Sequence, residues 1–518
     1  MTASEQLAQF AAGSKALPKL CREYKKERAT VHLKELVGGA LSFYAAAAVA
    51  KTGGVHIFVA EDRDAAAYLL NDFYNLLDEK QVYFFPSSYK RSAAYGAEDA
   101  QGVVQRTTAM NAVRGFTKGY LVVCTYPEAL AERVVDAATL QRDTIAVKLG
   151  DKISIAVLED ALADANFTRV DFVYEPGQYS VRGGIVDVFS YSESKPYRID
   201  FFGDEVDSIR RFNISSQLSA DKLDRVEIVP NLNAGEAPRV SFVQFAGSSA
   251  TCWFYDADYV LRRVNDLRRK VLADMEEPGQ IDRLLTSRNV LLRDMAGNSV
   301  VALRDNLPER PATAAVVFDT APQPKFNKNF EMLADDMIRN SLRGYATYIL
   351  SENKVQVERL ENIFHQIGRG QAAVRSLSVT LHEGFVDNDL KLCLYTDHQI
   401  FDRYQRYRIN GEIRRDEQMT VAELNQLRPG DYVVHIDHGV GRFDGLVKIN
   451  ENGKVHEAIK LVYKDGDVLF VNVHSLHRIS RYKSGDGEPP KVYKLGNGAW
   501  QKLKNAAKKA VKDISREL

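Results

Sequence analysis

Three short, uninterrupted apolar runs in the first 130 residues place the strongest constraint on the fold of this chain. They are Val55–Ala60, Gln81–Pro86 and Tyr120–Thr125, and helical stretches separate them. Strands that are apolar on both faces are typical of a parallel sheet covered by helices on both sides. The spacing of the runs is that of successive strand–helix–strand units. The sequence therefore predicts that residues 1–130 begin an α/β module.

Changes of pattern along the 518 residues predict a multidomain α/β protein. Strands separated by Gly- and Pro-containing turns predict an α+β insert, after which α/β character returns. Asn452-Gly453 and Asp465-Gly466 lie between apolar strands, a strong hairpin signal, so a small β-barrel is expected near the C-terminus. The expected boundaries are 1–130 for the first part of the α/β module, 131–221 for the insert and 222–322 for completion of the module. They continue with 323–412 for a further α/β domain, 413–428 for a linker, 429–484 for the β-barrel, and 485–518 for a second linker and the start of a basic helix.

Charge and cysteine usage exclude several classes of protein. Lys plus Arg and Asp plus Glu both number 69, so no net charge draws the chain toward nucleic acid. The four cysteines are far apart and form no CxxC pair, which argues against a zinc ribbon and against a disulfide framework. The sequence shows no signal peptide and no apolar run of the ~20 residues that a membrane span needs. We therefore expect a cytoplasmic protein without a membrane partner.

The sequence lacks the phosphate-binding loop GxxxxGK[ST] that an N-terminal α/β module prompts one to look for. The turn after the strand Val31–Val37 offers only Gly38-Gly39. Lys51-Thr52 falls at the end of the following helix and not at its start, where anions bind. The strand Cys252–Tyr255 leads into Asp256-Ala257-Asp258, without the Asp-Glu pair of a magnesium-dependent ATPase. We therefore expect no catalytic residue and no cofactor.

Two His-x-x-His pairs are the candidate metal ligands, His435 with His438 and His474 with His477. In a strand, side chains three residues apart point to opposite faces, so such a pair does not converge on one ion. The interpretation that follows is structural histidines in a small barrel, and no metal site is expected.

Two long segments carry a resemblance to known families. Glu175–Phe189 (EPGQYSVRGGIVDVF) and Tyr197–Ile209 (YRIDFFGDEVDSI) resemble a stretch shared by two bacterial repair families: UvrB, the damage-verifying subunit of the excision nuclease, and the transcription-repair coupling factors (Mfd). Arg428–Phe443 (RPGDYVVHIDHGVGRF), continuing to Ser475–Tyr482, is similar to the RNA-polymerase-interacting module of the coupling factors and to the CarD family of transcription regulators. UvrB has no such module and keeps a functional phosphate loop, so the resemblance favours the coupling factors along the whole chain.

This resemblance implies a non-catalytic N-terminal part of a coupling factor, which binds stalled RNA polymerase through its β subunit. It would recruit UvrA, the damage-sensing ATPase, to start nucleotide excision repair of the transcribed strand. The first module would be a degenerate RecA-like, UvrB-like fold, and the β-barrel would be Tudor-like or CarD-like. The motor, an ATP-dependent translocase that contacts double-stranded DNA, would lie beyond Leu518 in the full-length protein.

Two alternatives to this function remain. A UvrB-like, ATP-dependent helicase or excision-nuclease subunit would require an intact phosphate loop. A free-standing CarD-like regulator is disfavoured by the long repair-type N-terminal region.

The strand Tyr197–Phe202 is the expected contact with UvrA. Alternation places every second side chain on the outer face, Arg198 and Phe202 among them. Clusters of arginine and aromatic residues are enriched at interface hot spots. Carried over by position, the resemblance assigns UvrA binding to Arg182, Arg198 and Phe202.

The segment Gly439–Asn450 is the expected contact with RNA polymerase. It is predicted to form a strand at the edge of the β-barrel, and such an edge accepts a strand from a partner. The resemblance implies that it pairs with the polymerase β subunit through Lys448, Ile449 and Asn450. Asn472, on the neighbouring strand, is the further contact that we expect.

Each of these sites has a purely structural alternative. Arg198 would pair with Asp187 or Asp200 on a solvated sheet, and Phe202 would pack beneath a turn. Ile449 would point into the barrel, and the lysine before it would blunt the strand edge.

Overall fold

The chain was analysed as a computed structural model. The structure describes residues 2–89, 99–214, 217–233, 237–275, 278–304, 306–307, 309–403, 405, 407–409, 424, 427–435, 437–451, 454–472, 479–482, 492 and 494–495. Within these ranges no helix has the length and apolar character that crossing a bilayer demands. The expected linker 413–428 and the tail 485–518 lie largely outside the described residues.

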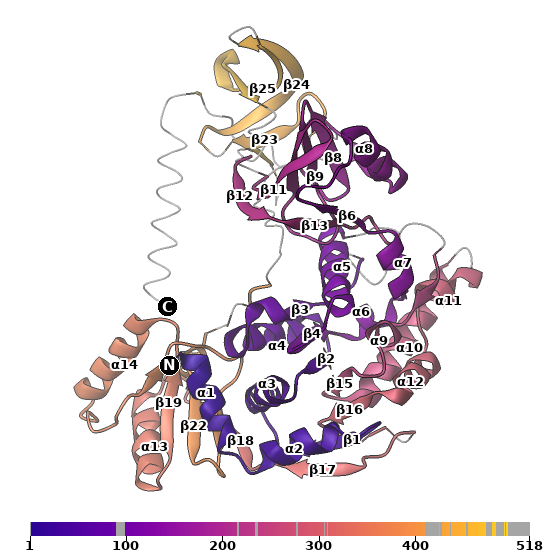
Figure 1. The fold of residues 1–518 in the computed structure, drawn as a ribbon. Helices are drawn as coiled ribbons and strands as arrows, with labels where there is room; N and C mark the ends of the chain where they lie inside the picture. Colours follow the sequence, from indigo (N-terminus) through magenta and orange to yellow (C-terminus); the bar gives the residue numbers. More distant parts are fainter. Residues whose placement is uncertain are drawn as a thin grey trace.

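A seven-stranded parallel sheet forms the centre of the first module (Figure 1). The three apolar runs form β2 (Gly54–Val59), β3 (Val82–Phe84) and β4 (Tyr120–Thr125), which pair in parallel in the order β2-β4-β3. The prediction of a parallel sheet is therefore confirmed. The remaining strands are β1 (Thr30–Lys34), which precedes β2, and three strands from beyond the insert, β15 (Thr251–Phe254), β16 (Ser299–Ala302) and β17 (Ala314–Val317). The full order is β17-β1-β16-β15-β2-β4-β3.

Helices pack around this sheet and share its buried core. Those of the N-terminal half of the module are α1 (Ala3–Ala12), α2 (Ala16–Tyr24), α3 (Ala40–Thr52), α4 (Arg63–Leu76), α5 (Ala100–Arg114), α6 (Pro127–Ala131) and α7 (Ala137–Arg142). Those that follow the insert are α9 (Phe242–Ala246), α10 (Ala257–Asp274), α11 (Ile281–Leu284) and α12 (Arg288–Asp294). Local sequence explains two of the starts, because the side chains of Asp62 and Asp256 accept hydrogen bonds from Ala65 N at 2.8 Å and Tyr259 N at 2.9 Å.

The insert forms a six-stranded sheet in the order β12-β11-β10-β9-β8-β7. Its strands are β7 (Thr168–Arg169), β8 (Gln178–Arg182), β9 (Ile185–Val188), β10 (Tyr197–Phe202), β11 (Glu205–Phe212) and β12 (Ser219–Leu223). The pairs from β8 to β12 are antiparallel, as the Gly- and Pro-containing turns predict. The helix α8 (Ile155–Asp164) contributes Leu158 and Leu162 to the core on one face of the sheet. The opposite face carries polar and charged side chains as well as buried residues such as Ser180, Asp187 and Phe212.

Two short ladders lie between this insert and the first module. They pair β6 (Ile145–Lys148) with β13 (Arg225–Ile228), and β5 (Val134–Val135) with β14 (Arg239–Val240).

A further α/β domain follows the first module. Its sheet runs β18-β21-β22-β19-β20, with β18 (Thr320–Pro322), β19 (Ala346–Leu350), β20 (Ser376–Leu377), β21 (Phe385–Asp387) and β22 (Leu392–Thr396). Its helices are α13 (Phe330–Leu342), α14 (Lys354–Gln366) and α15 (Asp397–Ile400). Leu381 and Phe385 belong to the same buried cluster as the first module, and the ring centroids of Phe385 and Phe43 of α3 are 5.4 Å apart. The two domains thus pack against each other through one buried cluster, and the further domain also has a core of its own that includes Leu333, Leu360 and Phe364.

The C-terminal sheet is antiparallel, in the order β26-β25-β24-β23-β27 (yellow in Figure 1). Its strands are β23 (Tyr432–His435), β24 (Gly439–Glu451), β25 (Lys454–Val462), β26 (Val468–Asn472) and β27 (Ile479–Arg481). Pairing of Glu451 with Lys454 confirms the first predicted hairpin. Asp465 and Gly466 have φ of 66° and 83° in the second turn, as its sequence predicts.

Candidate functional site

A buried carboxylate lies between two arginines on the outer face of the insert sheet. Tyr197 and Ile199 of β10 are buried on the opposite face, which confirms the predicted alternation. Asp187 of β9 is 1% exposed and stands opposite Arg198 of β10. Arg198 Nε and Nη2 donate to Asp187 Oδ1 and Oδ2 at 2.7 and 2.8 Å, and Arg182 Nη2 donates to Asp187 Oδ2. A bidentate pair of this kind fixes the plane of the guanidinium group.

Both guanidinium groups are also supported by aromatic rings. Arg182 lies over Phe172 with 4.5 Å to the ring centroid, and Arg198 lies over Phe212 with 4.4 Å. Arg198 Nη1 donates to Gln217 O at 3.2 Å, and the hydrogen bond to the carboxylate raises the pKa of Arg198. The side chains of Arg182 and Arg198 are 35% and 15% exposed. Both arginines are therefore held in place, and the side chain of Arg182 is the more exposed of the two.

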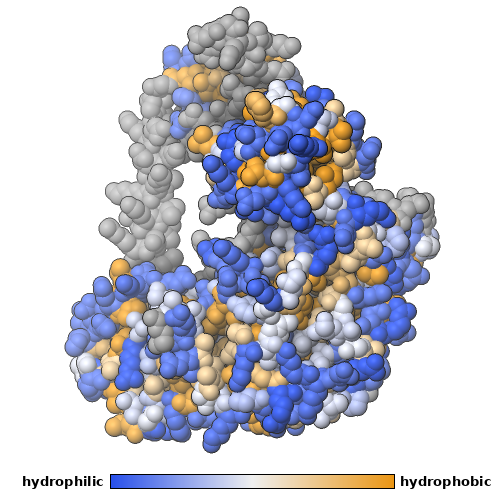
Figure 2. Space-filling view, in the orientation of Figure 1, coloured by the Kyte–Doolittle hydropathy of each residue, from blue (hydrophilic) through white to orange (hydrophobic). Residues whose placement is uncertain are grey.

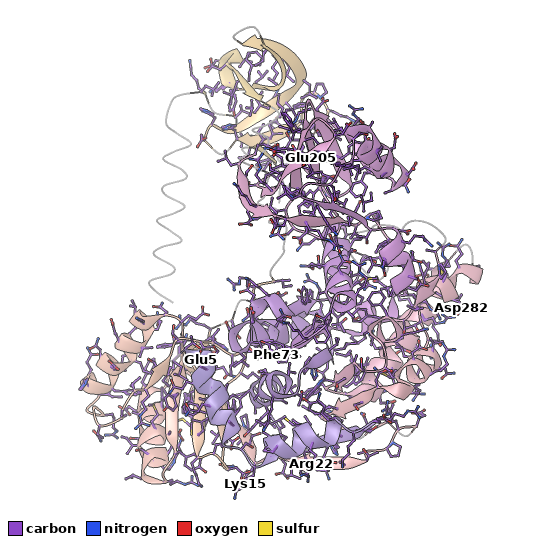
Figure 3. All side chains as sticks on the ribbon, viewed as in Figure 1. Glu5, Lys15, Arg22, Phe73, Glu205 and Asp282 are labelled. Atoms are coloured by element: carbon purple, nitrogen blue, oxygen red, sulfur yellow. The ribbon has the colours of Figure 1, made fainter. Side chains whose placement is uncertain are left out.

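Phe202 lies at the end of β10 and is 84% exposed. It pairs with Glu205, labelled in Figure 3, across a two-residue turn that begins with Gly203. Gly203 has a φ of 61°, a conformation that a side chain disfavours and that this tight hairpin requires. The alternative in which Phe202 packs beneath a turn is therefore wrong, whereas the alternative pairing of Arg198 with Asp187 is present. Figure 2 shows mainly hydrophilic residues on the visible face of the molecule.

The strand β24 has an open edge over only part of its length. Its residues from Gly439 to Arg442 pair with β23, and those from Arg442 to Glu451 pair with β25. The prediction of an edge strand is therefore wrong for the first residues of β24. In the described part of the sheet, the residues from Leu446 to Glu451 pair with β25 alone. A bulge between Phe443 and Leu446 separates the two parts of the strand.

The residues predicted to bind RNA polymerase lie on this open part of β24 or on β26. Ile449 is half-buried and pairs with His456, so it is neither a full core residue nor a freely exposed one. The side chains of Lys448, Asn450 and Asn472 lie outside the described atoms, although their backbones belong to β24 and β26.

The first His-x-x-His pair does not obey the expected alternation. The ring centroids of His435 and His438 are 4.8 Å apart, because the chain leaves β23 at His435 and turns before His438. The prediction that the two side chains point apart is therefore wrong. In the described part of the chain, no group of three or more His, Cys, Asp or Glu residues is arranged to hold a metal ion. His474 and His477 lie outside the described residues.

The Gly38-Gly39 turn lies at the start of α3, and the neighbouring domain closes it. A Cβ atom on Gly39 would lie only 2.1 Å from Glu383 O, so only glycine permits this approach. The carbonyl of Glu383 thus packs directly against the turn that precedes α3. Lys51-Thr52 is at the far end of α3, as expected.

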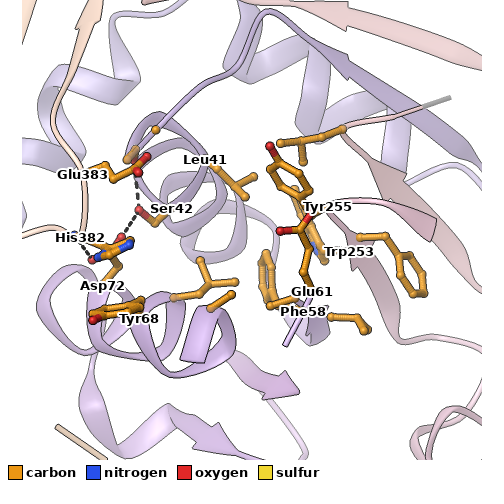
Figure 4. Close-up of a pocket in the computed structure, with 18 residues that line it drawn as sticks. Leu41, Ser42, Phe58, Glu61, Tyr68, Asp72, Trp253, Tyr255, His382 and Glu383 are labelled. Atoms are coloured by element: carbon orange, nitrogen blue, oxygen red, sulfur yellow. Dashed lines mark hydrogen bonds between the residues drawn. The ribbon is translucent and has the colours of Figure 1, made fainter. Parts of the chain in front are cut away.

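The closing segment is fixed by a buried aspartate of α4 (Figure 4). His382 N donates to Asp72 Oδ1 at 2.6 Å, and Ser42 Oγ donates to Asp72 Oδ2 at 2.7 Å. Burial raises the pKa of Asp72 to about 7. Sequence reasoning missed this contact, because nothing local marks residues more than 300 positions apart as neighbours.

Comparisons with known proteins place both sheets in described families. The family profile named UvrB interaction domain matches residues 145–233, and the profile named CarD-like/TRCF RID domain matches residues 427–483. Among curated proteins, the transcription-repair-coupling factors of Bacillus subtilis and Escherichia coli are each 24% identical over 94% of this chain and 48% of their own length. That of Staphylococcus epidermidis is 23% identical over 86% of this chain and 44% of its own. The chain spans about half the length of these relatives. The chain is thus similar to the transcription-repair-coupling factors along nearly all of its own length, and it matches a UvrB interaction domain followed by a CarD-like/TRCF RID domain.

Proposed function

We propose that this chain binds stalled RNA polymerase and recruits UvrA, and so begins nucleotide excision repair of the transcribed strand. The observation that carries the proposal is that one chain joins a UvrB interaction domain, with an exposed aromatic on the same sheet as two held arginines, to a CarD-like/TRCF RID domain with a partly open strand edge. Neither domain match alone would link repair to transcription.

The contact with UvrA is made by Arg182, Arg198 and Phe202 in this proposal. The arginines supply charge and donor groups whose positions Asp187 has already fixed, so little side-chain freedom is lost on binding. Phe202 supplies an apolar ring that is already exposed in the unbound chain. This combination of arginine and aromatic residues is typical of the residues that dominate binding energy.

The contact with the RNA polymerase β subunit is made by the open part of β24. A strand of the partner would add to the sheet beside Leu446–Glu451 and satisfy the backbone groups of that edge. Ile449, with Lys448 and Asn450 beside it and Asn472 on β26, would give this pairing its selectivity.

The chain contributes binding, and not ATP hydrolysis, to this function. The carbonyl of Glu383 closes the turn where a phosphate loop would act, and Asp256 is used as the cap of α10. Both contacts argue against a UvrB-like helicase. Translocation and the main contact with double-stranded DNA would belong to the other half of a full-length relative.

Biolayer interferometry with the whole chain tests the proposal in three separate arms: UvrA, the isolated polymerase β-subunit region, and ATP. We expect binding in the first two arms and none in the third. Phe202→Ala should weaken the UvrA arm alone, and Ile449→Arg should weaken the polymerase arm alone. Absence of binding in both protein arms, or binding of ATP, would refute the proposal.

A further inference from the structure

A cavity of about 270 Å³ lies beside the closed Gly38-Gly39 turn (Figure 4). It opens at the carboxyl ends of β2 and β15, the edge at which open α/β sheets bind their ligands. Its walls are mainly aromatic and aliphatic, and include Leu41, Phe58, Tyr68, Trp253, Tyr255 and Leu303. A space of this size and character is suited to a small organic molecule.

The charged residues that line the cavity are acidic, and the guanidinium of Arg304 lies outside this lining, 5.8 Å from the ring centroid of Tyr255. Glu61, Asp72 and Glu383 line it, and none of its described lining residues is lysine or arginine. Glu61 and Glu383 are exposed, so a ligand can reach both carboxylates. The carboxylate of Asp72 already accepts hydrogen bonds from Ser42 and His382. The carboxylates that a ligand could pair with at this cavity are therefore those of the two glutamates.

Phosphate is excluded from this cavity by geometry as well as by charge. Glu383 O packs against Gly39, next to the helix N-terminus that would attract a phosphate. The first amides of α3 are used within the turn, since Ala40 N donates to Val37 O and Leu41 N donates to Gly38 O. An anion would therefore meet carboxylates and a carbonyl oxygen in place of donors.

We propose that this cavity binds a small organic cation with a flat, apolar body. The body would fill the aromatic and aliphatic space, and the positive group would face one of the two glutamates, which lie on different sides of the cavity (Figure 4). Aromatic walls add to the attraction, because the faces of aromatic rings are electronegative. The cavity has the position of a nucleotide site in the sheet but the opposite electrostatic preference. This inference does not depend on the protein partners proposed above.

Isothermal titration calorimetry of the whole chain with three probes of one ring system tests the charge preference. Tryptamine is the cation, tryptophol the neutral analogue and indole-3-acetate the anion. We expect tryptamine to bind about fivefold more tightly than tryptophol, the factor that an exposed ion pair can supply. Indole-3-acetate and ATP should give no binding heat. If indole-3-acetate or ATP binds as tightly as tryptamine, or more tightly, the proposal is overturned. Absence of tryptamine binding to the folded chain would also overturn it.

Variants of the lining residues locate the site. The double variant Glu61→Gln/Glu383→Gln should bind tryptamine only as tightly as tryptophol, and Ala65→Phe should weaken both probes by filling the cavity. Glu352→Gln, an exposed residue outside the lining, is the matched control and should change neither affinity. The thermal midpoint of each variant reports whether it has folded. Unchanged tryptamine binding in a folded double variant would place the cation elsewhere and refute the assignment.

Discussion

The insert sheet and the C-terminal sheet offer partners two different kinds of surface. On the outer face of β8–β10 the groups presented are side chains, two arginines and an exposed ring. On β24 the group presented is the backbone of Leu446–Glu451, which pairs on one side only in the described sheet. Binding at the first surface depends on arginine side chains that Asp187 holds in position. Binding at the second surface depends on the register of the paired strands. We therefore expect the two surfaces to fail in response to different substitutions.

The internal ion pair of the insert sheet should give the largest effect. Asp187→Ala leaves two arginines without their buried carboxylate, and the loss of one partner of such a pair costs about 3 kcal/mol or more. Hydrogen-exchange mass spectrometry of β9 and β10 measures this loss as reduced local protection. Asp207→Ala, at an exposed position of β11, is the control. A decrease below about 1 kcal/mol would show that the arginines are held without Asp187.

The open edge of the C-terminal sheet should be blocked by a charge. Ile449→Arg is expected to weaken binding of the polymerase β-subunit region by about 30-fold, equivalent to ~2 kcal/mol. Binding of UvrA should not change. Val468→Arg, at an exposed position of β26 in the same sheet, is the matched control for an added arginine. If both variants weaken binding equally, the edge of β24 has no special role.

The exposed ring of the insert sheet should give a smaller effect, confined to affinity. Phe202→Ala is expected to weaken UvrA binding about tenfold, or ~1.4 kcal/mol. It should leave hydrogen-exchange protection unchanged, because Phe202 is 84% exposed. Leu218→Ala removes another exposed apolar side chain before β12 and serves as the control. Loss of protection on substitution of Phe202 would mean that the ring has a structural role.

A change in salt concentration should give the smallest difference between the two surfaces, measured as the loss of binding affinity. Raising the ionic strength from about 0.1 M to about 1 M shortens the Debye length from ~10 Å to ~3 Å. UvrA binding, which uses arginines, should then weaken severalfold more than polymerase binding, which uses backbone hydrogen bonds. Surface plasmon resonance at the two salt concentrations measures both affinities. A stronger salt dependence on the polymerase side would reverse the comparison.

Much of the fold followed from periodicity alone. Continuous apolar runs predicted the parallel strands β2, β3 and β4, and alternation correctly placed the two faces of β10. Turn residues predicted both hairpins of the C-terminal sheet. The exposed Phe202 was also predicted as a contact residue, although only the structure showed that no turn covers it.

The expectations that failed concern neighbours in space. The expectation that β24 is an edge strand was wrong for its first residues, because they pair with β23. The expectation that the side chains of His435 and His438 point to opposite faces was wrong, because a turn interrupts the strand between them. In both cases the local pattern was read correctly, but the pairing partner or the chain direction decided the outcome.

The sequence by itself determined which segments are strands, which face of each strand is apolar, and that the Gly38-Gly39 turn carries no lysine for phosphate. These properties depend on residues a few positions apart, whose side chains respond to one local backbone geometry. Only the tertiary structure decided that Asp187 holds two arginines and that Glu383 closes the turn before α3. The first contact depends on the register of β8, β9 and β10 within one sheet, and the second depends on how two domains pack.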